Sequence, residues 1–295
     1  MKFAIILNGI SRKKKFFYGS LLSALQTKFD CTVFETKYNG HASELARLLP
    51  DEFTAVLAAG GDGTLHEVLN GIMRRNSPLA LGIIPLGLGN DFAATCGVRA
   101  NVSSMLHVLN GLPKPTDIGK ISCTDDNGNL KHEFFLNVCS VGMGPNTVTR
   151  MAQLPTWLGA HGKYLSAIIL TFLTDKAEEI QIEGNCFEWK GNARVIAVAN
   201  GKSFGNKIYI APHAQIDDGL LNLFVGGDVP LPKFLWYLQQ MKNNREVNAR
   251  QIRYCVADDL RLSSARPTKL EADGELVGWL PATIRMVTNC INMLR

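Results

Sequence analysis

The segment Gly60–Thr64 reads Gly-Gly-Asp-Gly-Thr, directly after an apolar run that predicts a strand and directly before a helical pattern. Glycines let the backbone turn sharply and let phosphate oxygens approach its amides. The helix that follows offers unpaired N–H groups and the positive end of its dipole. Asp62 adds a carboxylate that can hold Mg²⁺ directly or through water. A plain connection between strand and helix would need only one glycine, so the segment favours phosphate binding.

A second loop, Pro85–Asp91, has a similar composition one strand later along the chain. It contains Gly87 and Gly89 and leads into another predicted helix, which Asn90 or Asp91 is expected to cap. Neighbouring strands of one parallel sheet would bring both glycine turns to the same rim, where such sheets bind ligands.

Other nucleotide motifs are excluded by single residues. Gly201-Lys202-Ser203 resembles the end of a P-loop, but Ile196 stands where that motif needs a glycine. Gly87 and Gly89 lack the third glycine of a dinucleotide fingerprint, because Phe92 takes its place. The protein-kinase motifs, H-E-x-x-H and G-x-S-x-G are absent from the sequence.

The first part of the chain alternates predicted strands with predicted helices, which is typical of a parallel sheet covered on both faces. The strands are expected at 2–7, 31–36, 53–59 and 79–84, and the helices at 16–29, 42–49, 64–75 and 91–96.

Beyond residue 117 the predicted strands follow one another, which favours an antiparallel β domain. They are expected at 118–123, 133–139, 179–183, 193–199, 220–225, 259–262 and 270–272, with helices at 164–173 and 231–241. Asn127-Gly128 and Asp273-Gly274 predict turns or hairpins between strands. The cluster of Gly111, Pro113 and Pro115 places a domain boundary close to residue 116.

Composition is compatible with a globular protein of two domains. The chain has 295 residues, of which 46% are hydrophobic and 19% charged. A net charge of +5 fits an anionic partner or ordinary solubility. Seven scattered cysteines predict free thiols in a reducing cytoplasm. The longest apolar run is shorter than the about 20 residues that span a bilayer.

Two segments of the sequence each allow two functional interpretations. Arg12–Lys15 either attracts phosphate or anionic lipid, or is a solvated loop. The apolar stretch of residues 164–173, with Leu154, Trp157 and Leu158, is either core or an acyl-chain channel.

Gly60–Thr64, extended through Glu67, Val68, Asn70 and Gly71, resembles the nucleotide-binding motif of the diacylglycerol kinase catalytic domain family. That family includes bacterial diacylglycerol and related lipid kinases, sphingosine kinases and ceramide kinases. NAD kinases share the Gly-Gly-Asp-Gly core, but the later segments resemble the lipid kinases. These segments are 85–93, Phe135 with Asn137 and Gly142, Asn200-Gly201, Ala211-Pro212, Asp217–Leu220 and Asp273–Glu275.

The resemblance implies an α/β plus β fold. Residues 1–116 would form a parallel-sheet nucleotide domain like that of NAD kinase and phosphofructokinase. Residues 117–284 would form a β-rich, sandwich-like lipid-substrate domain, and about 285–295 would return to the first domain. ATP and Mg²⁺ would be the cofactors, with ATP between the domains.

The resemblance also implies residue roles. Glu275 would be the general base on the lipid hydroxyl, and Asp62 would act with it in catalysis. The metal ligands would be Gln215, Asp218 and the Leu220 carbonyl. ATP would be held by Asn8, Thr36, Gly60, Gly61, Asp62, Gly63, Thr64, Leu65, His66, Gly87 and Asn90. Two positions depart from the family: Gly9 stands where a proline is usual, and Leu88 where a threonine is usual.

We therefore expect an ATP-dependent lipid kinase that acts on diacylglycerol, in the cytoplasm and peripherally at the membrane surface. Sphingoid bases, phosphatidylglycerol and NAD are alternative substrates, and a non-catalytic nucleotide-binding regulator is an alternative class. No nucleic-acid partner is expected, and a homodimer stays open.

Overall fold

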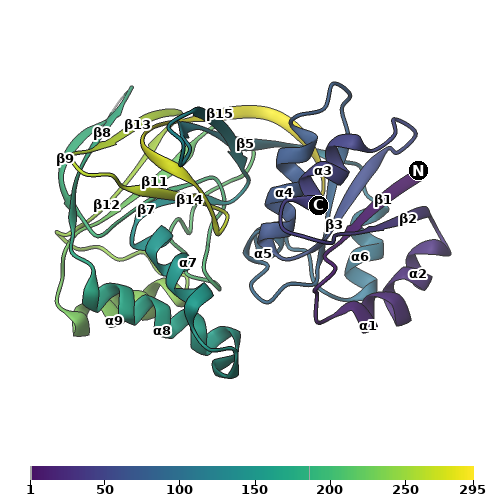
Figure 1. The fold of residues 1–295 in the computed structure, drawn as a ribbon, viewed down its shortest axis with the longest axis horizontal. Helices are drawn as coiled ribbons and strands as arrows, with labels where there is room; N and C mark the ends of the chain where they lie inside the picture. Colours follow the sequence, from purple (N-terminus) through teal and green to yellow (C-terminus); the bar gives the residue numbers. More distant parts are fainter. Residues whose placement is uncertain (1, 186) are drawn as a thin grey trace. The chain divides into compact units, whose positions relative to one another are not determined.

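The computed structural model describes residues 2–185 and 187–295, apart from the side chains of residues 156, 160 and 161 (Figure 1). Two compact units divide the chain. The first comprises Met1–Asp117 with Asn289–Arg295, and the second comprises Ile118–Thr288. The predicted thiol of Cys186 lies outside the described residues.

The first unit contains a parallel sheet in the order β4-β3-β1-β2. Its central strands are apolar and buried along almost their whole length, as expected when helices cover both faces. The last residues of the chain join this sheet, because Met293 of β15 pairs in parallel with Leu81. The strands are β1 (Lys2–Leu7), β2 (Asp30–Glu35), β3 (Ala55–Gly60), β4 (Ala80–Pro85) and the end of β15 (Glu275–Leu294).

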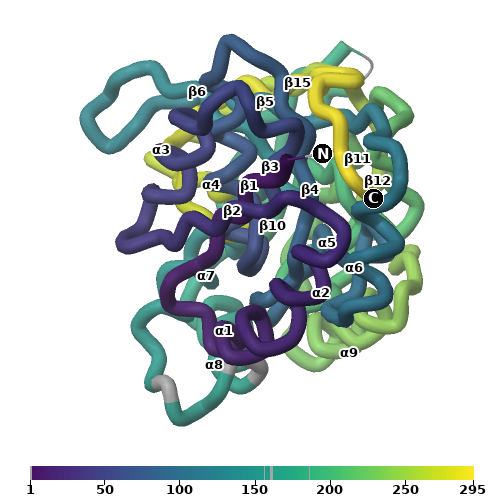
Figure 2. The backbone as a smooth tube through the Cα atoms, turned by 90° about the vertical axis from the view of Figure 1, so that its right-hand side faces the viewer, coloured from purple at the N-terminus to yellow at the C-terminus, as the bar shows by residue number. Residues whose placement is uncertain are grey.

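Helices lie on both sides of this sheet, with α3 and α4 on one side and α1, α2 and α6 on the other (Figures 1 and 2). The helical segments are α1 (Lys14–Phe16), the π-helical η1 (Phe17–Leu21), α2 (Leu22–Gln26), α3 (His41–Leu48), α4 (Asp62–Ile72), α5 (Asp91–Thr95) and α6 (Val102–Leu109). The single helix expected at 16–29 is therefore three consecutive segments. Helix α6 was not predicted, although the Asn101 side chain accepts the Ser104 N–H at 2.8 Å as a cap.

The second unit is built from antiparallel strands in two layers that share β15. One layer has the order β12-β11-β10-β7-β14-β15, and in the other β13 pairs with β15 and β8, and β8 with β9. The strands are β5 (Lys114–Thr124), β6 (Leu130–Phe135), β7 (Val138–Gly142), β8 (Glu178–Gly184), β9 (Glu188–Ala193), β10 (Val195–Ala199), β11 (Leu221–Gly226), β12 (Ile252–Ala257), β13 (Asp259–Ser264) and β14 (Lys269–Ala272).

Two apolar clusters stabilise this unit. One lies between the layers and includes Phe135, Ile182 and Ile284, which are fully buried. The other packs strand residues such as Phe224 against helical residues such as Ile168. Its helices are α7 (Met143–Gln153), α8 (Gly159–Thr174) and α9 (Leu231–Lys242), and the short 3₁₀ segment η2 (Thr156–Leu158) precedes α8.

The predictions for the second unit differ from the structure in four places. The strands expected at 133–139 and 193–199 are each divided in two, and helix α7 and strand β12 were not predicted. The breaks fall at Asn137 and Arg194, but single polar residues are also common within strands, so alternation alone does not mark such breaks.

The cysteines and helices agree with the expectations from composition. Within the described ranges the six cysteines are free thiols. None of the helices in those ranges is long and apolar enough to cross a membrane.

Candidate functional site

The first glycine turn connects β3 to α4. Gly61 takes an extended conformation (φ −99°, ψ −168°) at the position before the helix. A Cβ on Gly60 would lie 2.3 Å from Thr64 Oγ1, so the turn has no room for a side chain there. The first N–H groups of a helix have no partners within it, so α4 presents donors at this turn. An anionic group is the natural ligand for such an arrangement.

The second glycine turn lies in contact with the first. The amides of Leu86 and Gly87 both donate to the Gly60 carbonyl at 2.9 Å. A Cβ on Gly87 would lie 2.4 Å from Gly61 Cα, so the two backbones approach as closely as only glycines allow. The two turns therefore form one rim of the parallel sheet, as their adjacent strands predicted.

Asp62 cross-links these turns through backbone amides. Its carboxylate oxygens accept the N–H groups of Asp91 and Phe92, each at 3.2 Å, and so stabilise the start of α5. Asn90 sits at the capping position with left-handed backbone (φ 55°), but its side chain exchanges hydrogen bonds with Gly87 at 2.9 and 3.0 Å. The expected cap by Asn90 or Asp91 is thus supplied by Asp62 instead, because the turns touch.

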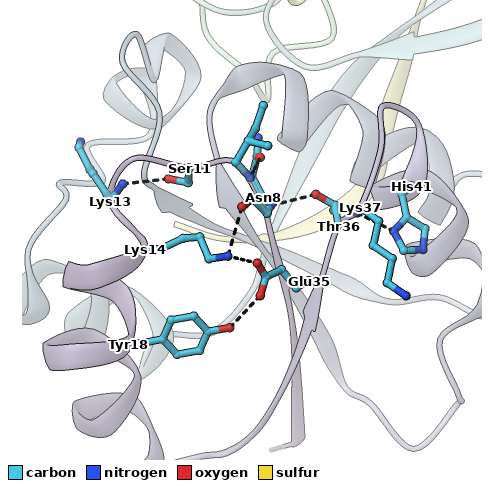
Figure 3. Close-up of polar contacts among 11 residues, drawn as sticks. Asn8, Ser11, Lys13, Lys14, Tyr18, Glu35, Thr36, Lys37 and His41 are labelled. Carbon is cyan, nitrogen blue, oxygen red and sulfur yellow. Dashed lines mark hydrogen bonds and ion pairs between the residues drawn. The ribbon is translucent and has the colours of Figure 1, made fainter.

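A third loop, after β1, completes this group of residues (Figure 3). Asn8 Nδ2 donates to Thr64 Oγ1 at 3.0 Å, and Asn8 Oδ1 accepts from the Ile10 amide at 3.1 Å. The Gly9 amide donates to Thr36 Oγ1 at 3.0 Å. A Cβ on Gly9 would lie 2.1 Å from the Thr36 carbonyl oxygen, so the loop backbone is specific to glycine.

Two lysines of the Arg12–Lys15 segment contact these loops. Lys14 Nζ donates to the Gly9 carbonyl at 3.2 Å and forms an ion pair with Glu35, which also accepts from Tyr18 OH (Figure 3). The hydrogen bond from Lys14 lowers the pKa of Glu35. Lys13 Nζ donates to the Gly87 carbonyl at 3.2 Å. Lysine side chains of the Arg12–Lys15 segment therefore contact the loops after β1 and β4. The sequence alone had left open whether this segment is solvated or attracts phosphate.

The Asp273-Gly274 turn in the second unit positions Glu275. Both turn residues have left-handed backbone (φ 53° and 90°), which makes a tight hairpin between β14 and β15. The Asp273 carboxylate accepts the amides of residues 136, 137 and 138 at 3.0, 2.9 and 3.1 Å. Glu275 opens β15 and is partly exposed, so its carboxylate is held on a rigid hairpin within reach of solvent.

The predicted metal ligands share one turn before β11. Asp218 Oδ1 accepts the Leu220 amide at 3.0 Å around Gly219, whose φ is +76°. Gln215, Asp218 and Leu220 are all exposed. Their oxygen donors suit a hard cation that keeps much of its water, so the residues fit Mg²⁺. Across residues 2–185 and 187–295, no three His, Cys, Asp or Glu side chains gather to hold a metal.

Comparisons with known proteins agree with this geometry. A model of the diacylglycerol kinase catalytic domain matches residues 2–121, and one of the YegS C-terminal NAD kinase beta sandwich-like domain matches residues 138–295. The diacylglycerol kinase of Bacillus subtilis (strain 168) is 30% identical over 293 residues, which are 95% of this chain and 92% of that protein. The chain belongs to the diacylglycerol kinase family.

One further relative supports this membership, and a solved structure shares the fold. A probable lipid kinase, YegS-like, from Cronobacter sakazakii is 31% identical over 250 residues, or 82% of this chain and 80% of that protein. A crystal structure of a diacylglycerol kinase from Bacillus anthracis shares the fold, with a TM-score of 0.74 at 20% identity over 99% of this chain and 96% of that one. Membership of the family makes this chain a lipid kinase.

The remaining predicted nucleotide residues differ in how they are placed. Leu65 and His66 are 4% and 5% exposed, and Asn70 Nδ2 donates to the His66 carbonyl at 3.0 Å. Their side chains are buried within the first unit, and the Leu65 amide donates to the Gly61 carbonyl at 3.1 Å within the helix, so the donors that α4 presents at the turn precede Leu65. Leu88 is 65% exposed between the two glycines of the second turn.

A buried carboxylate next to the Asp273-Gly274 turn was missed by sequence reasoning. Glu271 is 2% exposed, accepts the Gly274 amide at 2.9 Å and accepts the Ser140 hydroxyl. Burial of a carboxylate requires such donors. The sequence feature that could have revealed it is a Glu within the otherwise apolar run 270–272, which was interpreted only as a strand.

Proposed function

We propose that this lipid kinase transfers the γ-phosphoryl group of ATP to the hydroxyl group of diacylglycerol. The observation that carries the proposal is the glycine turn at the start of α4, held against the second glycine turn, where the first N–H groups of the helix are donors for phosphate oxygens. The preference for diacylglycerol is supported by the name of the Bacillus subtilis relative, which is similar over nearly the whole chain.

In the proposed reaction, the acceptor oxygen forms a bond to the γ-phosphorus while the bond to the ADP oxygen breaks. The amides of Gly60–His66 would hold the phosphates, and Asn8 and Thr36 would hold the loop that borders the nucleotide. Glu275 would accept the proton of the lipid hydroxyl, which must leave as the phosphoryl group arrives.

Charge on the phosphates would be offset by two groups. Mg²⁺ supplies positive charge there when bound, whereas Gln215, Asp218 and the Leu220 carbonyl would hold a separate, structural Mg²⁺. Lys13 adds positive charge from the protein at the loop after β4, whereas the charge of Lys14 is offset by its ion pair with Glu35. Asp62 is bonded to the amides at the start of α5, so its contribution is to keep the two glycine turns together.

The test is transfer of labelled phosphate from ATP in mixed micelles that contain diacylglycerol, phosphatidylglycerol or a sphingoid base, and to NAD without micelles. We expect labelled phosphatidic acid, and a loss of about 100-fold or more in kcat for Glu275→Gln. Glu179→Gln is the matched control, because Glu179 is an exposed carboxylate of the same unit that pairs with Lys190 at the surface.

Each other outcome identifies an alternative. Label on another lipid or on NAD would replace diacylglycerol as the substrate. ATP binding with no transfer to any acceptor would instead support a non-catalytic nucleotide-binding regulator. Glu275→Gln with unchanged kcat would remove Glu275 from the role of base.

A further inference from the structure

Helix α8 is apolar around most of its circumference. Its inward face packs in the second unit through Ala167, Ile168 and Phe172, which are at most 5% exposed. Its outward face carries Leu173, which is 61% exposed, with Leu165 and Leu170, which are 43% and 40% exposed. A helix that is hydrophobic all round is normally buried, so the outward face of α8 is an unusual surface for water.

Helix α9 has the same character. Tyr237, Leu238 and Met241 are buried, while Leu235 and Trp236 are 39% and 56% exposed. The two helices are joined by the stacked rings of Phe172 and Phe234, whose centroids are 4.1 Å apart. Both helices lie along the same edge of the second unit in the two views of Figures 1 and 2.

The charges on these helices have one sign. Neither α8 nor α9 contains Asp or Glu, and their charged residues are Lys163, Lys233 and Lys242. Of the acidic residues that flank the two helices, Asp175 pairs with Arg150 at 2.6 Å and Asp228 with Arg194 at 2.5 Å, and Glu246, after α9, lies 4.0 Å from His213 Nε2. The surroundings of the exposed apolar side chains are therefore positive.

We propose that the α8–α9 face docks flat onto an anionic lipid surface. This face is defined as Leu165, Leu170, Leu173, Leu235 and Trp236, with Lys163, Lys233 and Lys242. Leu and Trp beside lysines are the residues of helices that lie in the plane of a membrane interface. The lysines disfavour pairing of this face with a second copy of itself, because like charges would meet.

The biological role of this docking face rests on the proposed function, because diacylglycerol resides in bilayers. The exposed apolar side chains and the lysines that support docking belong to α8 and α9 alone. Docking would place the second unit, which carries Glu275, at the surface where the lipid substrate resides, without any helix crossing the bilayer.

The experiment is co-sedimentation of the full-length protein, without ATP, with vesicles of phosphatidylcholine alone or with phosphatidylglycerol. We expect binding that increases with the anionic lipid. Leu173→Glu and Trp236→Glu should each lower the partition coefficient at least tenfold, because each removes apolar burial and adds a repelled charge. Lys233→Glu should lower it about fivefold or more on anionic vesicles only.

Leu130→Glu is the matched control, because Leu130 is 71% exposed in the same unit but lies on β6, away from these helices. Its partitioning should equal that of the unchanged protein. Equal losses for Leu130→Glu and Trp236→Glu, or binding unaffected by Leu173→Glu and Trp236→Glu, would overturn the proposal. A dimer in light scattering that Trp236→Glu converts to monomer, with no vesicle binding, would identify a second copy as the occupant instead.

Two measurements distinguish a failure of the docking proposal from a failure of the proposed kinase function. Thermal melting shows whether each variant is folded, and Lys233→Glu provides a second test if Trp236→Glu is not. Phosphorylation of a short-chain, water-soluble diacylglycerol should proceed equally in the unchanged protein and Trp236→Glu. Vesicle binding without any phosphorylation would leave the docking face intact and reject the kinase assignment alone.

Discussion

Replacing Gly87 by Ala should separate the two glycine turns. The new Cβ would lie 2.4 Å from Gly61 Cα, 2.8 Å from Asn90 Oδ1 and 3.0 Å from Gly61 N. Carbon atoms in contact normally lie about 3.5–4.0 Å apart, so the backbones must move by roughly 1 Å. The obstructing atoms belong mainly to backbone, so no change of rotamer can relieve the contact.

Two effects follow from this displacement. Overpacking of this kind costs about 1–3 kcal/mol of the free energy of unfolding. A shift of about 1 Å in phosphate-binding groups lowers the rate roughly 100-fold, because the reacting groups lose their alignment. We therefore expect Gly87→Ala to fold at 25 °C but to lose about 100-fold in kcat/KM for ATP.

Urea unfolding and steady-state kinetics with the labelled-ATP assay measure the two effects separately. Gly19→Ala is the matched control, because Gly19 is exposed in a helical segment and a Cβ there meets no atom within 4 Å. It should unfold at the same or a higher urea concentration and keep its kcat/KM. A kcat/KM for Gly87→Ala within threefold of the unchanged protein would refute the reasoning that the contact of the two turns positions the phosphates.

Three further predictions concern other parts of the two units. Thr36→Val removes the acceptor of the Gly9 amide, so ATP affinity measured by calorimetry should fall about three- to tenfold, whereas equal affinity would exclude this loop from nucleotide binding. Asp273→Asn replaces one of the oxygens that accept the amides of residues 136–138 by a donor, so urea unfolding should show a loss of about 1–3 kcal/mol, and an unchanged midpoint would contradict the cross-link. Burial raises the pKa of Cys96 to about 12 and that of Cys31 to about 11, above the ordinary value of 9.0. Above about pH 9 the thiols of the unfolded chain lose protons that the folded protein keeps, so the free energy of unfolding should fall as the pH rises from 9 to 11. The fall should be shallower in Cys96→Ala. A free energy of unfolding that rises over this pH range would contradict the prediction.

A structural feature could be predicted from the sequence when residues close together along the chain define it. The Gly60–Thr64 turn was predicted because an apolar strand, a glycine turn and a helix follow one another within a few residues. The Asp273-Gly274 hairpin was recognised for the same reason, since two adjacent residues that tolerate positive φ define that turn.

The features that sequence reasoning missed depend on partners far along the chain. The prediction that Asp62 acts in catalysis and holds Mg²⁺ stays a prediction, but the hydrogen bonds from its carboxylate to amides 29 and 30 residues away were not foreseen. The burial of Glu271 is made possible by Ser140, from a strand 131 residues earlier. No local pattern reports such contacts, because they exist only when the strands pair.

The sequence by itself determined the two glycine turns, the alternation of strands and helices before residue 117, and the hairpin that carries Glu275. Each of these is encoded by neighbouring residues whose backbone preferences and periodicity are independent of the rest of the chain. Only the tertiary structure decided that Gly61 and Gly87 touch, that Lys13 and Lys14 reach the two loops, and that one face of α8 stays in water. The physical reason is that burial and polar pairing are properties of packed elements, so the same apolar helix is core on one side and surface on the other.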